Sequence, residues 1–180
     1  MDELWLSSKN MKAIVFILMI AAPLAMGAEV SPIRLRVEQV SKDTHGKFDH
    51  KQEKSLKVEL SNSSADELGG VKVSYFYFAR EVKSGDLAQV GKGEMTAQVK
   101  AHGSTMLETP GVSVSYTEAH TEGNPFANRG KSGNKQQAAH VKTVAASGRR
   151  FYGYGVRVSR GGEVVAEYFS EPSLKAKVGG

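Results

Sequence analysis

The sequence contains no cysteine. This absence excludes a disulfide framework, a thiolate zinc site, a cysteine nucleophile and a lipid-modified cysteine at a mature N-terminus. Tryptophan is almost as scarce, because the single copy, Trp5, lies near the N-terminus. A domain that begins after this segment therefore lacks both the buried tryptophan and the inter-sheet disulfide of antibody-type domains.

Catalytic signatures are also missing. The sequence has no Gly-x-Ser-x-Gly nucleophile elbow and no glycine-rich loop between a strand and a helix that would hold a phosphate. Its carboxylates are scattered, so no pair stands out as general acid and base. No segment has the pattern of a long amphipathic helix, and there is no heptad or fixed-period repeat. We therefore expect a protein that is not an enzyme and needs no cofactor.

The composition is that of a globular chain. Of 180 residues, 40% are hydrophobic and 24% are charged, which argues against disorder and allows one domain with a sizeable core. The formal net charge is +5. A positive charge of this size favours weak attraction to polyanions, but it carries no information about fold.

The N-terminal segment, residues 1–27, has the pattern of a secretory signal peptide. A lysine precedes the apolar run "AIVFILMI" (13–20), and the small-residue stretch "AAPLAMGA" (21–28) follows it. Pro23 interrupts the apolar stretch, which is too short to span a bilayer comfortably. An amphiphilic N-terminal helix or anchor is the alternative. We expect no transmembrane segment in the mature chain.

The cleavage site is predicted from small side chains. Ala25 and Gly27 form the best −3/−1 pair, so Ala28 is the expected first mature residue, and cleavage after Ala28 is nearly as good. Residues 1–10 are acidic and polar, which is unusual before a signal peptide, and we interpret Met11 as the true start. The expected location is the periplasm, the outer-membrane surface or the medium.

Residues 28–180 have the pattern of a single all-β domain. "SPIRLRVEQV" and "KSLKVELSN" alternate apolar and polar residues, as half-buried strands do, whereas "VKVSYFYFAREV" is apolar on both faces and predicts a central strand covered on both sides. Turn signals recur about every ten residues. We predict an immunoglobulin-like antiparallel β-sandwich with a long loop and a C-terminal hairpin.

The C-terminal hairpin is predicted at Gly161-Gly162, between two β-rich runs. Its first strand, "RRFYGYGVRV", is basic and aromatic, but it departs from the RNA-recognition pattern at Phe151, Gly155 and Arg157, so we expect no nucleic-acid partner. Gly153 and Gly155 are interpreted as places where a ring or backbone approaches closely. Strict alternation predicts a buried face that consists of Tyr152, Tyr154, Val156 and Val158. The opposite face then consists of Phe151, Gly153, Gly155 and Arg157.

The segment 119–140 is predicted to be long and irregular, and a loop of this length is usually functional or disordered. Basic residues occur in it and in the strand that follows. If they converge, they form a positive surface for an acidic glycan, a lipid head group or an acidic protein, although an ordinary solvated face is the favoured interpretation. The candidate surface comprises Phe126, Arg129, Lys131, Lys135, Arg149, Arg150 and Arg157.

Metal-ligating side chains gather in residues 41–54, which we interpret as a polar loop or hairpin. The group consists of Asp43, His45, Asp49, His50 and Glu53, and His120 and His140 bracket the long segment. Imidazole is a good zinc or copper ligand. No spacing here matches a closed zinc site, however, so a solvated polar region is favoured and no metal is expected. Asn62-Ser63-Ser64 fits the glycosylation pattern but is interpreted as a turn.

Four stretches carry a family resemblance: "LKVELSN", "VKVSYFYFARE", "VGKGEMT" and "YGYGVRVSRGGEVVAEYFSEPSL". With the leader before them, the chain resembles small secreted immunoglobulin-like proteins of Gram-negative envelopes. More narrowly, it resembles proteins encoded beside type IV pilus components in mucin-dwelling gut bacteria. The motifs are structural, so the resemblance implies a non-enzymatic envelope, surface or pilus-associated protein. Because the assembly helix of a true pilin is missing, it does not imply a filament backbone.

Two functions follow as hypotheses. In the first, the chain binds envelope or pilus-associated proteins through its sheet edges and the 119–140 segment. In the second, it is a secreted carbohydrate-binding module for mucin glycans, with exposed aromatics such as Tyr116, Phe126 or Tyr152 stacking on sugars. Aromatic residues are more often part of a core, which favours the first hypothesis.

Overall fold

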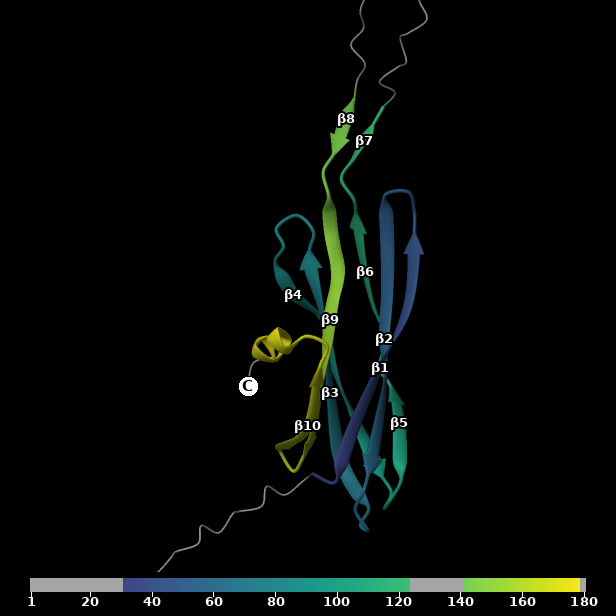
Figure 1. Cartoon of the computed structure of the whole chain (residues 1–180), viewed down its shortest axis with the longest axis vertical. Coiled ribbons are helices and arrows are strands. Elements are labelled where there is room, and N and C mark those ends of the chain that lie inside the picture. The colour runs from purple at the N-terminus through teal and green to yellow at the C-terminus, as the bar shows by residue number, and fades with distance from the viewer. Residues whose placement is uncertain (1–30, 124–140, 179–180) are drawn as a thin grey trace, which may run out of the picture. The chain divides into compact units, whose positions relative to one another are not determined.

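The structure is a computed structural model that describes residues 31–123 and 141–178 (Figure 1). The predicted signal peptide, residues 1–27, lies outside these residues. The described part is almost entirely β-structure, with one short 3-10 helix, η1 (Pro172–Lys177). The strands are β1 (Ile33–His45), β2 (Asp49–Asn62), β3 (Leu68–Glu81), β4 (Leu87–Val99), β5 (Ser104–Glu108), β6 (Val112–Thr117), β7 (His120–Glu122), β8 (Lys142–Val144), β9 (Ser147–Arg160) and β10 (Glu163–Phe169).

The strands form one eight-stranded antiparallel sheet and one small two-stranded sheet. The main order is β1-β2-β6-β9-β3-β4, with β5 paired to β2 and β10 paired to β9, whereas β7 and β8 pair only with each other. The all-β, antiparallel prediction is confirmed. The hydrogen-bonded link between the two halves of the main sheet is short, because β6 meets β9 at only Tyr116↔Gly148 and Thr117↔Ser147.

Both halves of the main sheet contribute to one hydrophobic core. Leu56, Val58 and Leu60 of β2 are fully buried in the same cluster as Val73 of β3 and Val156 of β9. They are inward because strand side chains alternate between faces. Burying each such side chain stabilises the fold by roughly 1.5–3 kcal/mol. The predicted inward positions of "KSLKVELSN" are thus confirmed.

A second, smaller cluster covers the opposite face of β3. Phe78 is 1% exposed and packs with Leu174 and Val178 from η1 and the residue after it. Pro172 begins this helix, a position where its missing N–H group needs no partner. The prediction that "VKVSYFYFAREV" is covered on both faces is therefore confirmed, and the C-terminal helix supplies much of the second cover.

The C-terminal hairpin forms at the predicted turn. Arg160 pairs with Glu163 around Gly161 and Gly162, whose φ values are +61° and +92°, a conformation that glycine adopts without strain.

The two strand glycines of β9 also behave as predicted. A side chain at Gly155 would overlap the ring of Phe169, and one at Gly153 would lie 2.9 Å from Leu174 Cδ1. Glycine here makes room for the packing of the C-terminal segment.

The predicted faces of β9 are wrong at its N-terminal end. The pairing with β3 shifts register between Phe78↔Gly153 and Ala79↔Phe151, so strict alternation fails there. As a result, Phe151 packs against the main core, whereas Tyr152 packs in the second cluster. Farther along, Tyr154, Val156 and Val158 are buried in the main core as predicted.

The segment after β6 is more regular at its ends than predicted. His120–Glu122 forms β7, and Lys142–Val144 forms β8. The three register pairs between β7 and β8 bring the two ends of the 119–140 segment together. Among the described residues, no helix is long and apolar enough to cross a membrane.

Candidate functional site

The inner face of the β1–β2 hairpin changes from apolar to polar along its length. In β2, the face that carries Leu56, Val58 and Leu60 continues as Lys54, Gln52 and His50. Opposite them in register lie Ser41, Asp43 and His45 of β1. Of the two interpretations of residues 41–54, a polar loop or a hairpin, the hairpin is confirmed, because these residues belong to two long paired strands and the turn between them. A polar site on the core-facing side of the hairpin results.

Lys54 and Asp43 form an ion pair at the border between this polar site and the core. Lys54 Nζ lies 2.7 and 2.8 Å from the two carboxylate oxygens of Asp43, and its side chain is only 6% exposed. The ammonium group is also 5.9 Å from the centre of the Phe151 ring. Because water cannot replace a lost partner well at this depth, the pair is expected to be tightly coupled.

His45 and His50 lie directly opposite each other next to the β1–β2 turn. Their Nδ1 atoms are 3.0 Å apart. His50 also stacks on Tyr116 of β6, with ring centroids 4.7 Å apart and planes 20° apart. Its Nε2 lies 3.5 Å from Glu118 Oε1. We refer to His45, His50, Tyr116 and Glu118 as the histidine cluster.

The ends of the 119–140 segment begin beside the histidine cluster. Phe48, in the β1–β2 turn, stacks on His120 of β7 at 3.8 Å between ring centroids. His120 Nδ1 is 2.9 Å from the Glu118 carbonyl oxygen. This carbonyl, and after it Glu122, raises the pKa of His120 above its ordinary value. The Glu118 N–H donates to the Phe48 carbonyl at 2.9 Å, so the chain leading into β7 is joined to the β1–β2 hairpin by a backbone hydrogen bond as well as by the stacked pair.

The predicted basic surface is divided by the structure. Arg149 pairs with Glu81 of β3 at 3.3 Å, whereas the guanidinium of Arg150 lies 5.5 Å from the centre of the Tyr116 ring, so Arg150 lies beside the histidine cluster. Arg157 is seven residues farther along β9, about 23 Å away at strand spacing. Phe126, Arg129, Lys131 and Lys135 lie outside the described residues.

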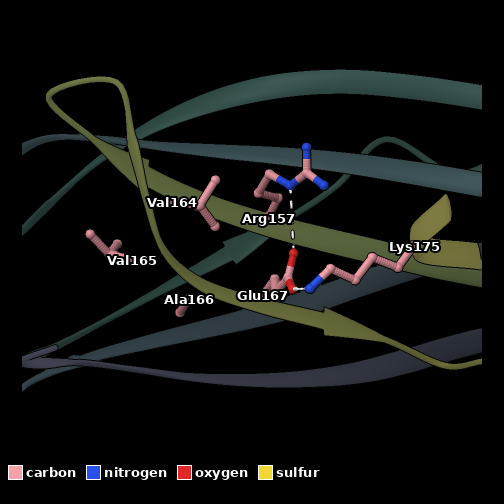
Figure 2. A pocket seen from close by; sticks show the side chains of 6 residues that line it. All are labelled: Arg157, Val164, Val165, Ala166, Glu167 and Lys175. Carbon is pink, nitrogen blue, oxygen red and sulfur yellow. Dashed lines mark ion pairs between the residues drawn. The ribbon is translucent and has the colours of Figure 1, made fainter. Parts of the chain in front are cut away.

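Arg157 belongs to a different site, on β9 and β10, where it shares one carboxylate with a lysine. Glu167 lies 3.7 Å from Arg157 Nε and also pairs with Lys175 of η1. Figure 2 shows the carboxylate between the two cations, beside Val164, Val165 and Ala166. These residues line a hollow of about 570 Å³ that opens to solvent. Because this site lies seven residues along β9 from Arg150, Arg157 does not extend a positive surface that begins there.

The aromatic residues proposed for sugar stacking are partly covered. Tyr116 contacts His50 and Arg150, and Tyr152 has the guanidinium of Arg80 at 4.5 Å from its ring centre. Neither ring is free on all sides. Asn62 is 3% exposed and donates to the carbonyls of Asp66 and Lys100, which agrees with the turn interpretation and leaves its amide inaccessible for glycosylation.

Sequence reasoning found the histidines but missed their arrangement. It did not place Lys54, Gln52 or Tyr116 beside the histidines. The signal was present for two of them, because uninterrupted alternation from Leu60 back to His50 puts every even-numbered residue of β2 on one face. Within residues 31–123 and 141–178, no three His, Cys, Asp or Glu side chains converge as metal ligands. Chemically, the histidine cluster contains two imidazoles, one carboxylate and one phenol ring, and the guanidinium of Arg150 lies over that ring.

Comparisons with known proteins give only distant likeness. No protein-family model matches the chain, and no curated protein does either. A solved structure that was a target of the Northeast Structural Genomics Consortium matches with a TM-score of 0.35 and 11% identity, covering 81% of this chain and 91% of that one. A structure from Akkermansia muciniphila matches with a TM-score of 0.29 and 12% identity, covering 81% and 75%. We infer nothing about function from matches this distant.

Proposed function

We propose that this chain is a non-enzymatic binding or structural protein of the bacterial cell envelope. It contacts envelope or pilus-associated proteins through its sheet edges and the 119–140 segment. The observation that carries the proposal is the β7–β8 ladder, which holds both ends of that segment beside the histidine cluster and Arg150. A scaffold that fixes the base of a long polar segment is the usual arrangement for loop-based recognition.

The sheet edges are the second part of the proposed surface. β1 and β4 stand at the two ends of the strand order, and each is 13 residues long. An edge strand presents backbone groups that can pair with an added strand. β1 exposes Arg34, Arg36 and Glu38, and β4 exposes Lys92 and Glu94. Such charges disfavour indiscriminate pairing and select a strand with complementary charge.

We also propose that the fold is an immunoglobulin-like sandwich. The support is the shared core of the two halves of the sheet and their short hydrogen-bonded link through β6 and β9. Export by a signal peptide would bring this domain to the periplasm, the outer-membrane surface or the medium. Acidic glycans are a further partner class, and nucleic acid is not expected as a partner.

The segment can be tested without removing its base. Residues 124–140 are replaced by a short Gly/Ser linker, so that β7 and β8 can still pair. We expect the variant to keep the thermal midpoint of the wild type but to lose most capture of envelope proteins. Unchanged capture would show that the segment is not part of the binding surface.

A carbohydrate-binding module remains the alternative function. It is favoured by one observation, the placement of Tyr116 and Arg150 beside the base of the segment, because a ring and a cation together suit an acidic sugar. A mucin-glycan array distinguishes the two. No binding supports the protein-partner proposal, whereas glycan binding that Tyr116→Ala abolishes would replace it.

A further inference from the structure

The two opposed imidazoles of the β1–β2 hairpin suggest a use that the proposed function does not include. A neutral histidine has one protonated and one unprotonated ring nitrogen. Two Nδ1 atoms at 3.0 Å therefore share one proton or, in its place, one cation. We propose that His45 and His50 form a two-histidine chelate for a divalent transition-metal ion, with Cu²⁺ as the best fit.

The separation of the two nitrogens sets the preferred coordination geometry. With metal–nitrogen bonds of about 2.0–2.1 Å, nitrogens 3.0 Å apart subtend an angle of about 94° at the metal. This is the angle between neighbouring ligands in a square-planar or octahedral complex, which Cu²⁺ and Ni²⁺ adopt. Tetrahedral Zn²⁺ needs nitrogens farther apart, at about 3.4 Å. The order of affinity is therefore Cu²⁺, then Ni²⁺ and Zn²⁺.

The surroundings of His50 hold one ligand in position. Its Nε2 faces Glu118 Oε1 at 3.5 Å, and its side chain is only 13% exposed. His50 Nε2 is buried and makes no hydrogen bond in this structure, and a small movement of Glu118 would let its carboxylate accept a hydrogen bond from a proton on Nε2, which leaves the Nδ1 lone pair for the metal. Metal-binding histidines typically have such a carboxylate on the second nitrogen. Stacking on Tyr116 further restricts rotation of the ring.

The surroundings of His45 provide access. His45 is exposed to solvent and lies at the last position of β1, so its ring can turn until its lone pair meets that of His50 at the ion. No third protein ligand converges on the pair within the part of the chain that the structure describes. Water or a partner's side chain would fill the remaining positions, so the affinity is that of a two-ligand site and the binding is reversible.

The proposal is tested by titrating the purified full chain with CuCl₂, NiCl₂ and ZnCl₂ in a weakly coordinating buffer. Calorimetry should show one Cu²⁺ ion bound per chain at the two-histidine site. The electron paramagnetic resonance spectrum of the Cu²⁺ complex should show two nitrogen ligands. His45→Gln and His50→Gln should each remove this site, and Glu118→Gln should weaken it roughly tenfold, because carboxylate partners of ligating histidines contribute 10–100-fold.

His102→Asn is the matched control. His102 lies outside the strands with a φ of +49°, a conformation that asparagine tolerates, and the variant should bind Cu²⁺ like the wild type. Circular dichroism confirms that each variant is folded. The proposal is overturned if a folded His45→Gln or His50→Gln variant retains the wild-type affinity, or if the spectrum shows a single nitrogen ligand.

Discussion

At the residue scale, Gly155 is a position with no room for a side chain. The ring of Phe169 occupies the space that a Cβ at residue 155 would need. We expect Gly155→Val to lower the free energy of unfolding by about 1–3 kcal/mol, as overpacked core sites do. Urea denaturation measures the change.

A matched control is available at Gly69, where an added Cβ would meet no atom within 4 Å. Gly69→Ala should therefore be nearly neutral. Combining Gly155→Val with Phe169→Ala should recover part of the lost stability, because the smaller side chain vacates the space. If Gly155→Val proves as harmless as the control, the close approach of Phe169 is wrong.

The Lys54–Asp43 pair makes a second prediction at this scale. Asp43→Ala leaves a lysine with a 6% exposed side chain without its partner, whose own side chain is 28% exposed. We expect a loss of about 1–3 kcal/mol in unfolding free energy, less than for a fully buried pair. The double variant Asp43→Ala/Lys54→Met should lose less than the two single variants together, because it leaves no unpaired charge. A double-mutant cycle measures this coupling, and additive effects would contradict the buried pair.

Tyr154 predicts a response to alkaline pH. Burial and, after it, the nearby Tyr168 raise the pKa of Tyr154 to about 12. The unfolded chain loses this proton near pH 10, so between pH 10 and 12 the folded state binds more protons and stability falls as pH rises. Tyr154→Phe should flatten that part of the stability–pH curve. An unchanged slope would show that Tyr154 ionises normally.

At the element scale, η1 is the clearest case of an element that acts through packing. Leu174 is fully buried against Phe78, and Leu174→Ala should lower the unfolding free energy by about 2–5 kcal/mol. Lys177→Ala, at an exposed position of the same helix, is the control and should change it little. Equal effects of the two variants in urea denaturation would show that η1 does not cover the core.

The same scale shows what the sequence could and could not predict. β2, β3 and the β9–β10 hairpin follow from alternation and from Gly161-Gly162, because both signals are local. The bulge puts Phe151 on the face of Tyr154 and Tyr152 on the other face, the reverse of the prediction. It has no local signal, since glycines at 153 and 155 also suit a regular strand. The histidine pair depends on the register of β1 against β2, which the turn at 46–48 sets and composition does not.

At the scale of the whole molecule, the candidate site combines strands that are far apart in sequence. Arg150 of β9 meets Tyr116 of β6, which stacks on His50 of β2. These contacts require the complete sheet order, which local patterns do not specify. The prediction therefore could not separate Arg150, beside Tyr116, from Arg149, which pairs with Glu81, and from Arg157, which pairs with Glu167. Only charge and chain position were available from the sequence.

The central claim is that the chain contacts envelope proteins through the base of the 119–140 segment and the sheet edges. The most direct measurement is site-specific photo-crosslinking in growing cells, with a photoreactive residue at Glu122 of β7, Lys92 of β4 or, as control, Lys57 on the outer face of the central strand β2. We predict crosslinks to envelope or pilus-associated proteins from Glu122 and Lys92 and none from Lys57. The account is contradicted if Glu122 and Lys92 crosslink to no envelope protein, or if Lys57 gives the same products.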